Sequence, residues 1–180
     1  MSTSVKKYGT GSMAFDGSGD WLASTASTDL YAFGTGAFTI EFWLYLNTTT
    51  GAQIVYDCRP SGTNGTQPII FVDSGVVKFQ HSTIVRITGA TLSTSTWYHI
   101  AVSRSGTDTK MFVNGTQSGS TYSSDSTSYS CGSGRPIMGT DAAGVNSNNL
   151  NGYIDDLRIT KGFARYTSNF TAPTAAFPNN

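Results

Sequence analysis

The segment that decides the fold is Asn151-Gly152-Tyr153-Ile154-Asp155-Asp156-Leu157-Arg158-Ile159-Thr160-Lys161. Within it Leu157 and Ile159 alternate with polar residues, which is the period of a β-strand with one buried face. Ile154 lies in the opposite phase, and the two adjacent aspartates stand at the join. A slip of one residue inside a strand predicts a β-bulge. At such a bend one carboxylate can bind a metal ion, stay solvated, or accept hydrogen bonds from nearby backbone N–H groups, and the strand alone leaves these alternatives open.

Short strands separated by turn residues fill the rest of the chain. We expect strands at 13–16, 20–23, 38–46, 52–58, 68–72, 76–81, 84–88, 97–104, 136–139 and 152–161, and a hairpin at 108–117. The pair Asn114-Gly115 supplies the positive φ that a tight hairpin turn needs. No segment shows helical periodicity over two turns, so the pattern predicts an all-β, two-sheet antiparallel sandwich.

Three segments between the strands are rich in small polar residues. Residues 24–36 and 140–149 read as loops, and residues 118–134 read as a long surface excursion suited to adaptable polar contact. After the last strand, residues 163–166 can form about one helical turn, and Thr171-Ala172-Pro173 is expected to release the tail. We expect one domain with a core at about 12–161 and a tail at 162–180, because a chain of 180 residues buries roughly 70% of its unfolded surface.

Composition excludes several classes of function. The formal net charge is zero and only 12% of residues are charged. The chain therefore has no basic surface for nucleic acid and no polybasic membrane patch. No apolar run reaches membrane-spanning length, and residues 1–7 lack the apolar core of a signal peptide. We therefore expect a soluble chain whose partners are neutral or polar.

The cysteines and the glycosylation-type sequons are weak signals. Cys58 and Cys131 are either two separate buried thiols or one disulfide bridge, and two cysteines alone do not decide between these states. The four Asn-x-Ser/Thr sequons are read as turn asparagines, at Asn47, Asn64, Asn114 and Asn169.

The strand at 38–46 has one apolar face and one amphipathic face. On the amphipathic face, Trp43 and Tyr45 either pack under a covering loop or offer stacking surfaces to a sugar ring. The strand at 97–104 places His99 on the same kind of face, where a hydrogen-bonded structural histidine is the first interpretation.

Three stretches together resemble the concanavalin A-like, laminin G-like jelly-roll family. They are Phe15-Asp16-Gly17-Ser18-Gly19-Asp20-Trp21-Leu22, then Phe38-Thr39-Ile40-Glu41-Phe42-Trp43 with Trp97-Tyr98-His99-Ile100-Ala101-Val102, and finally residues 151–159, with Phe112-Val113-Asn114-Gly115 also in place. The resemblance covers nearly the whole chain in the family's order. It implies two curved antiparallel sheets packed face to face, with the first and last strands adjacent on one sheet.

The same resemblance implies a structural calcium ion. Adjacent first and last strands bring the corner of Asp16 and Asp20 close to Asp155, and family members often hold calcium there with the aspartate of the last strand as a ligand. Asp155 is the first expected ligand, Asp16 the second and Asp20 the third, because calcium prefers six to eight oxygens. Asp156 is expected to pair with a neighbouring base or with solvent.

Hydrolytic activity is not expected. The fold family includes glucanases, whose chemistry needs two suitably spaced carboxylates on one sheet face. Glu41 is the only glutamate in the chain, and the family's Glu-x-Asp-x-x-Glu pattern is absent. His81 and His99, the two histidines, do not neighbour a nucleophile elbow.

The resemblance favours a non-catalytic, surface-exposed module that binds a glycan or another host-surface ligand. Sugar sites combine a stacking aromatic ring with polar groups that fix hydroxyls, so the candidate contacts are Trp43, Tyr45, Arg59, Asn64 and His99.

Residues 160–167 and the loop at 57–65 further resemble the version of this fold found in bacteriophage virion and tail proteins. This implies a place on a virion surface, or otherwise an extracellular one. The alternative function is a structural or decorating protein that contacts other virion proteins and binds no glycan. A homo-oligomer is compatible with both functions.

Overall fold

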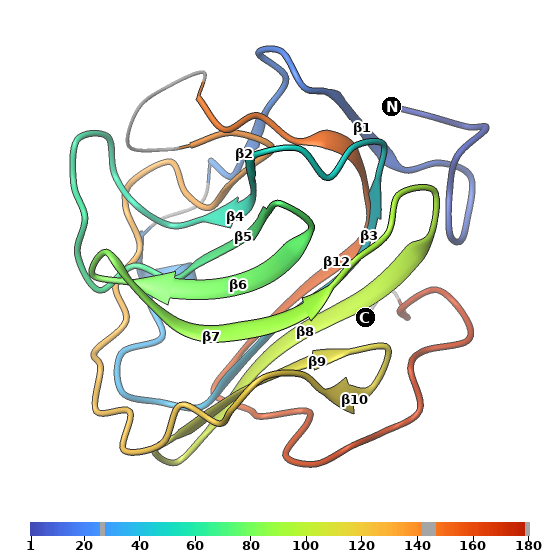
Figure 1. Cartoon of the computed structure of the whole chain (residues 1–180). Helices are drawn as coiled ribbons and strands as arrows, with labels where there is room; N and C mark the ends of the chain where they lie inside the picture. Colours follow the sequence, from blue (N-terminus) through green and yellow to red (C-terminus); the bar gives the residue numbers. More distant parts are fainter. Residues whose placement is uncertain (26–27, 142–146, 179–180) are drawn as a thin grey trace.

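The chain folds into two six-stranded antiparallel sheets that pack face to face (Figure 1). The computed structural model describes residues 1–25, 28–141 and 147–178. The first sheet contains, in spatial order, β1 (Met13–Asp16), β12 (Asn151–Lys161), β3 (Phe38–Leu46), β8 (Trp97–Ser105), β9 (Asp108–Val113) and β10 (Thr116–Gln117). The second sheet contains β2 (Leu22–Ala23), β11 (Ile137–Met138), β4 (Ala52–Asp57), β5 (Ile69–Asp73), β6 (Val76–His81) and β7 (Ile84–Thr91). The expected all-β sandwich is confirmed.

Most of the expected strands are present within a few residues of their predicted bounds. The β9–β10 turn has positive φ at both Asn114 and Gly115, as the hairpin prediction requires. Two local predictions are wrong: residues 163–166 form no helical turn, and a short helix, α1 (Thr28–Tyr31), lies inside a predicted loop. No helix among the described residues is long and apolar enough to cross a membrane.

Strand alternation builds the core between the sheets. In β3, every second side chain turns toward the second sheet and is at most 1% exposed, namely Phe38, Ile40, Phe42, Leu44 and Leu46. We call the face of each sheet that is turned away from this core its outer face.

The segment at 118–134, predicted as a surface excursion, is partly buried. Tyr129 is 1% exposed and packs between the rings of Phe38 and Phe79, with centroid distances of 5.3 Å and 6.2 Å. Its hydroxyl donates to Asp125, which is fully buried and also accepts from the Thr109 hydroxyl. The prediction was wrong here because the many serines of this segment suggested a surface loop. Tyr129 can nevertheless be buried, since its hydroxyl is hydrogen-bonded to Asp125.

The predicted bulge in β12 is confirmed. The register of β12 against β3 shifts between Asp155 and Arg158, as a bulge requires. Asp156, inside this shift, has a φ of 52°. β1 pairs with β12 from Met13 opposite Ile154 to Asp16 opposite residue 151, so the first and last strands are adjacent as expected.

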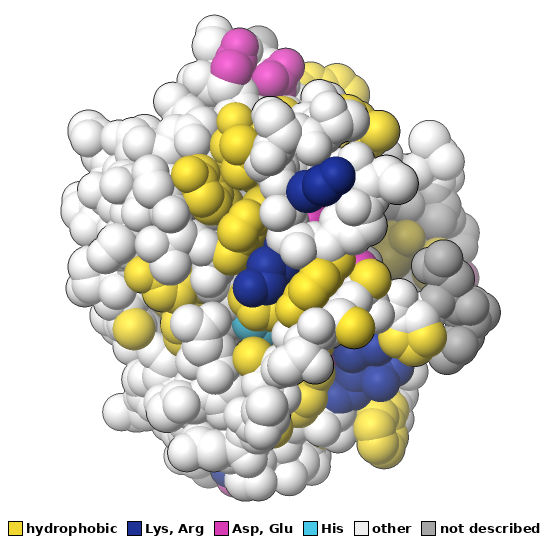
Figure 2. All heavy atoms as spheres, turned by 90° about the vertical axis from the view of Figure 1, so that its right-hand side faces the viewer, with side chains coloured by type: hydrophobic (Ala, Val, Ile, Leu, Met, Phe, Trp, Pro, Cys, Tyr) yellow, Lys and Arg dark blue, Asp and Glu magenta, His cyan; other side chains and the backbone are white. Residues whose placement is uncertain are grey.

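Both chain ends cover the outer face of the first sheet. They lie on the right in Figure 1, and Figure 2 shows a broken band of hydrophobic side chains across this side, with Lys and Arg side chains set into it. Tyr8 packs edge-on against Trp43 at 5.7 Å and donates a hydrogen bond to the Pro173 carbonyl at 2.8 Å. The Phe177 N–H donates to Asp156, so the tail is not released at residues 171–173, and that prediction is wrong.

Candidate functional site

A small pocket of about 180 Å³ opens on the outer face of the second sheet. It combines apolar side chains with polar ones at its edge, and it is lined by Ala52, Ile54, Ile69 and Phe71 together with Arg59, Gln80, Asp141 and Asn148. Ligand pockets for larger molecules are typically about 300–1,000 Å³, so this one is suited to a single small ring.

The apolar floor follows from the sequence of β5. Residues 69–72 are all apolar, and alternation turns Ile70 and Val72 into the core while Ile69 and Phe71 face outward. The register of β4 against β5 places Ile54 opposite Phe71. An apolar patch therefore lies on a sheet face that is usually polar in antiparallel sandwiches.

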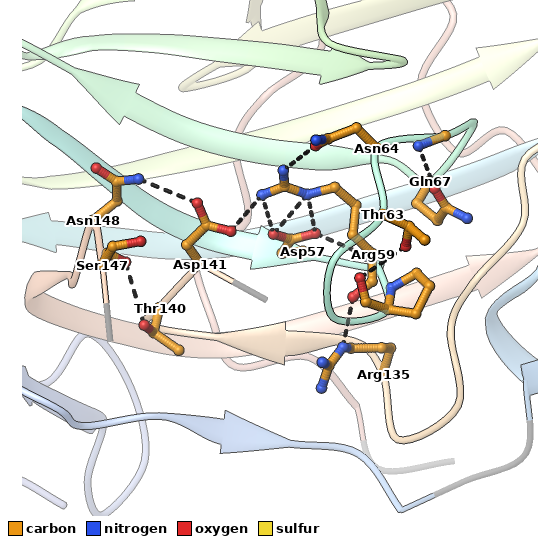
Figure 3. Close-up of polar contacts among 12 residues, drawn as sticks. Asp57, Arg59, Thr63, Asn64, Gln67, Arg135, Thr140, Asp141, Ser147 and Asn148 are labelled. Atoms are coloured by element: carbon orange, nitrogen blue, oxygen red, sulfur yellow. Dashed lines mark hydrogen bonds and ion pairs between the residues drawn. The ribbon is translucent and has the colours of Figure 1, made fainter. Parts of the chain in front are cut away.

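Arg59 is the centre of the polar edge (Figure 3). Its Nη2 donates to Asp57 at 2.6 Å and to Asp141 at 2.8 Å, its Nη1 donates to Asn64 at 2.6 Å, and its Nε donates to Asp57 at 3.1 Å. The guanidinium thus joins the end of β4, the loop that follows it and the loop after β11. A guanidinium that is hydrogen-bonded to several partners cannot change rotamer easily. Any N–H group of Arg59 that is left for a ligand therefore points in a fixed direction.

Charge and burial explain why this cluster is stable. Arg59 is 7% exposed and Asp57 is fully buried. An unpaired charge at either position would be costly. Burial lowers the pKa of Arg59, but the hydrogen bond and charge of Asp57, together with Asp141, outweigh it and leave this pKa above its ordinary value. The guanidinium therefore stays charged.

The far edge of the pocket comes from the loop after β11. The Asn148 amide donates to Asp141 at 3.3 Å, and the Asp141 N–H donates to the Ser147 carbonyl at 3.0 Å. Asn148 has a φ of 52°, which asparagine tolerates better than most residues. Of the predicted polar loop at 140–149, residues 142–146 lie outside the described residues.

The predicted ligand contacts are divided between the two outer faces. Arg59 lines the pocket, and Asn64 supports it from the loop. Tyr45 lies on the first sheet, half-buried in a row with Trp97 and Tyr153 at ring distances of 5.4 Å and 5.5 Å.

Trp43 and His99 also lie on the first sheet, but beneath the chain ends. Trp43 is 4% exposed, with the Lys7 ammonium 4.1 Å from its ring centroid, and His99 is fully buried. The covering interpretation therefore holds for Trp43, and in this arrangement neither ring is accessible to a ligand.

Glu41 and His99 belong to a closed polar cluster. The Glu41 carboxylate accepts hydrogen bonds from Arg158 at 2.8 Å and Tyr166 at 2.7 Å, and lies 3.3 Å from the His99 ring. Burial opposes ionisation, but these three hydrogen bonds and the charge of Arg158 outweigh it, so the pKa of Glu41 is below its ordinary value. The single glutamate is a buried structural anion.

The three predicted calcium ligands are not brought together. Asp155 Oδ2 accepts the N–H groups of Lys7 at 2.8 Å and Tyr8 at 3.1 Å, and its Oδ1 accepts that of Asp156 at 2.9 Å. Asp16 pairs at the other end of the β1–β12 ladder.

The residues at the Asp16 corner hold one another instead. Asp16 accepts the Ser18 N–H at 2.7 Å, and Asp20 accepts the Asp16 N–H at 3.2 Å. Within residues 1–25, 28–141 and 147–178, no group of three or more His, Cys, Asp or Glu side chains could hold a metal ion. As placed, Asp155, Asp16 and Asp20 do not fit one shared calcium ion, and calcium binding stays a prediction.

Several pocket residues were not identified from sequence. Asp57 and Asp141 bind Arg59, although they lie 2 and 82 residues from it in the sequence. Gln80 and Asn148 also line the edge of the pocket. The floor had a detectable signal, because four consecutive apolar residues in an antiparallel strand place two of them on the outer face. The contact between Arg59 and Asp141 had no sequence signal, because it depends on how two distant loops pack together.

The sequence matches the family model of the concanavalin A-like lectin/glucanases superfamily, Laminin_G_3, over residues 16–163. The chain therefore belongs to this superfamily. No curated protein sequence matches it.

Solved structures share the fold at low sequence identity. The Ruminococcus gnavus IT-sialidase CBM40, bound to α2,3-sialyllactose, has a TM-score of 0.69 at 12% identity, covering 92% of this chain and 95% of that one. Domains LG4-5 of the mouse laminin α1 chain have a TM-score of 0.60 at 13% identity, covering 90% and 46%. A Bacteroides ovatus protein has a TM-score of 0.63 at 12% identity, covering 86% of this chain, which spans only 44% of that protein.

Proposed function

We propose that this chain is a non-catalytic carbohydrate-binding module that holds one sugar ring in the pocket beside Arg59. The observation that carries the proposal is the pairing of an apolar floor, half-buried at Ala52 and Phe71, with polar groups that are already held in place. The half-buried ring of Phe71 can pack against the C–H face of a pyranose. Arg59, Asp141 and Asn148 offer donors and acceptors at the edge for its hydroxyl groups.

Preorganisation supports this proposal. Binding costs less when side chains are already ordered, because fewer rotamers are lost on association. Arg59 is fixed by Asp57, Asp141 and Asn64, and Asp141 is fixed by Arg59 and Asn148. The superfamily membership and the sialyllactose-bound module of the same fold also support carbohydrate binding.

The arrangement of carboxylates supports a binding role over hydrolysis. Glycoside hydrolysis needs a pair of carboxylates that flank the scissile bond, one as acid and one as base or nucleophile. Glu41 is fully buried on the opposite sheet, and Asp57 and Asp141 both pair with the same guanidinium. The two carboxylates beside the pocket thus serve to hold Arg59 in place.

A glycan array with two matched variants tests the proposal. Phe71→Ala removes the aromatic ring from the pocket floor, and Tyr45→Ala removes a half-buried aromatic ring from the outer face of the other sheet. We expect wild-type and Tyr45→Ala proteins to bind the same glycans and Phe71→Ala to lose binding, with near-UV circular dichroism confirming that both variants fold. Loss of binding in Tyr45→Ala alone would move the site to the aromatic row, and a blank array for wild type would contradict carbohydrate binding.

We further propose, from the sequence resemblance, that the module is displayed on a phage virion, where a purely structural role is the alternative. Antibody labelling of native particles tests the location, and light scattering of the purified chain tests for a homo-oligomer. Association with virion proteins combined with a blank glycan array would favour the structural role.

A further inference from the structure

The charge of the pocket bears on which sugars it takes. Among the residues that line the pocket, Arg59 carries the positive charge and Asp141 the negative one. Arg59 lies 2.6 Å from a second carboxylate, Asp57, and 2.8 Å from Asp141. One guanidinium therefore faces two carboxylates, and within this triad the carboxylates outnumber the cation by one.

Two further cations lie near this triad. Arg135 donates through its Nε to the Arg59 carbonyl at 2.7 Å and through its Nη1 to the Gly134 carbonyl, and it is not among the residues that line the pocket. Lys78 lies beside the floor, with its ammonium 5.9 Å from the ring centroid of Phe71. It forms an ion pair with Asp73 at 2.7 Å, so the two charges largely cancel. The segment that follows Asp141, residues 142–146, contains no charged residue in its sequence. An anionic ligand would thus approach a guanidinium that is already paired with two carboxylates.

We infer that the pocket selects neutral sugar rings and rejects sialylated or uronic ones; this rests on the proposed function. A sugar carboxylate approaching Arg59 would have to displace Asp141 or lie beside it, and like charges in contact weaken binding strongly. A neutral ring meets no such opposition, because its hydroxyls can donate to Asp141 and accept from Asn148. The site therefore differs in ligand class from the sialyllactose-bound module of the same fold.

The test compares matched pairs of glycans, each neutral oligosaccharide beside its sialylated form, such as lactose and α2,3-sialyllactose. We expect the neutral member of each bound pair to bind at least about tenfold more tightly. In Asp141→Asn, which removes one carboxylate, this preference should shrink. Asp108→Asn is the matched control, because it makes the same change in net charge at an exposed position on β9 and should keep the wild-type preference.

The outcomes separate this inference from the proposed function. Tighter binding of sialylated members, or an unchanged preference in a folded Asp141→Asn protein, overturns the neutral-ligand inference and leaves carbohydrate binding intact. Binding of neither member of any pair overturns both.

A second inference rests on a separate observation, the contact between Cys58 and Cys131. Their Sγ atoms are 2.7 Å apart, and the two residues are 0% and 7% exposed. The Gly132 N–H donates to the Cys58 carbonyl at 2.8 Å, so the two backbones run together beside the thiols. The Arg135 Nε donates to the Arg59 carbonyl at 2.7 Å, which ties the same two segments a few residues further on.

We propose that Cys58 and Cys131 form an intramolecular disulfide when the chain folds with oxidised glutathione. One thiolate attacks the glutathione disulfide and releases one reduced glutathione; the second thiolate then attacks the mixed disulfide and releases another. Both cysteines are oxidised, one oxidised glutathione is reduced to two thiols, and the protons balance. Burial raises the pKa of the Cys58 thiol, so the exchange belongs to folding, when both thiols are exposed.

The test refolds the full chain in oxidised or in reduced glutathione and counts thiols in denaturant. We expect no titratable thiol, a mass lower by two hydrogens and a higher urea midpoint after oxidative refolding, because a cross-link restricts the unfolded chain. Cys131→Ala should instead trap a mixed disulfide with glutathione at Cys58. Two free thiols in a natively folded oxidative sample, or a disulfide-linked dimer, would overturn the proposal.

Discussion

The hydroxyl of Tyr166 donates a 2.7 Å hydrogen bond to the carboxylate of Glu41, so the C-terminal tail holds the only glutamate of the chain. Arg158, His99 and Arg165 also contact this buried anion, and Tyr166 stacks on Phe170 with ring centroids 3.6 Å apart. The tail therefore completes the structure of the first sheet by satisfying a charge that the sheet itself buries.

Tyr166→Phe should lower the free energy of unfolding by about 1.5–3 kcal/mol, because it removes a hydrogen bond to a buried carboxylate. Urea unfolding at neutral pH measures the loss. The matched control is Tyr8→Phe, which removes a hydrogen bond to the neutral Pro173 carbonyl. A hydrogen bond between neutral groups contributes less, so the control should lose only about 1 kcal/mol. Equal losses in the two variants would contradict the role assigned to Glu41.

Gly115→Ala should lift the tail from the sheet. A Cβ atom at Gly115 would overlap the Phe170 carbonyl oxygen, at a position whose φ is 81°. Gly106→Ala is the control, because Gly106 has a φ of 59° but faces open space. Both variants carry a left-handed backbone strain of about 1–2 kcal/mol. We expect faster proteolysis after residue 162 only in Gly115→Ala, and equal proteolysis in both variants would show that the clash is relieved elsewhere.

Stability should fall between pH 6.5 and about 4 because of His81. Burial, aided by the charge of Arg86 and opposed by that of Asp125, lowers its pKa from 6.5 to about 4. Between these pH values His81 binds a proton in the unfolded chain but stays neutral in the folded chain. The free energy of unfolding therefore decreases as pH falls, by at most about 1.4 kcal/mol per pH unit.

His81→Gln should flatten this part of the profile. Urea midpoints at several pH values above about 5 measure the slope without interference from the carboxylates, whose ordinary pKa values are lower. A variant that keeps the full wild-type slope would show that another group is responsible.

Asp155→Asn should destabilise the chain by about 1–3 kcal/mol, because Asp155 satisfies three backbone N–H groups. The loss is measured both in excess chelator, where the three hydrogen bonds alone contribute, and in excess calcium, where a bound ion would enlarge it. Asp16→Asn, at the exposed corner, is the control and should cost less. A melting temperature that rises with calcium in the wild type but not in Asp155→Asn would establish calcium binding at Asp155.

Local pattern was enough to predict the strands and the bulge. Alternation placed β3 at its observed bounds, and the phase slip in β12 identified the bulge at Asp156, because a period of two is a property of the backbone. The two adjacent strands at the sheet edge followed from the family resemblance. These features depend on neighbours in sequence or on motifs carried over as a whole.

Contacts between distant segments were the part that sequence could not supply. Arg59 was identified as a binding candidate, but its partner Asp141 lies 82 residues away and is placed by loop packing. His99 and Trp43 were correctly placed on the amphipathic face, yet their burial depends on chain ends that dock without strand or helix periodicity. Segments of this kind give no sequence signal of where they dock.

The meeting of Tyr8 with Pro173 has a practical consequence for handling the protein. Both covering segments lie on the outer face of the first sheet, and the pocket beside Arg59 opens on the outer face of the second. A sensor chip or bead attached through these covering segments, near Tyr8 or Pro173, will therefore present the pocket to the solution.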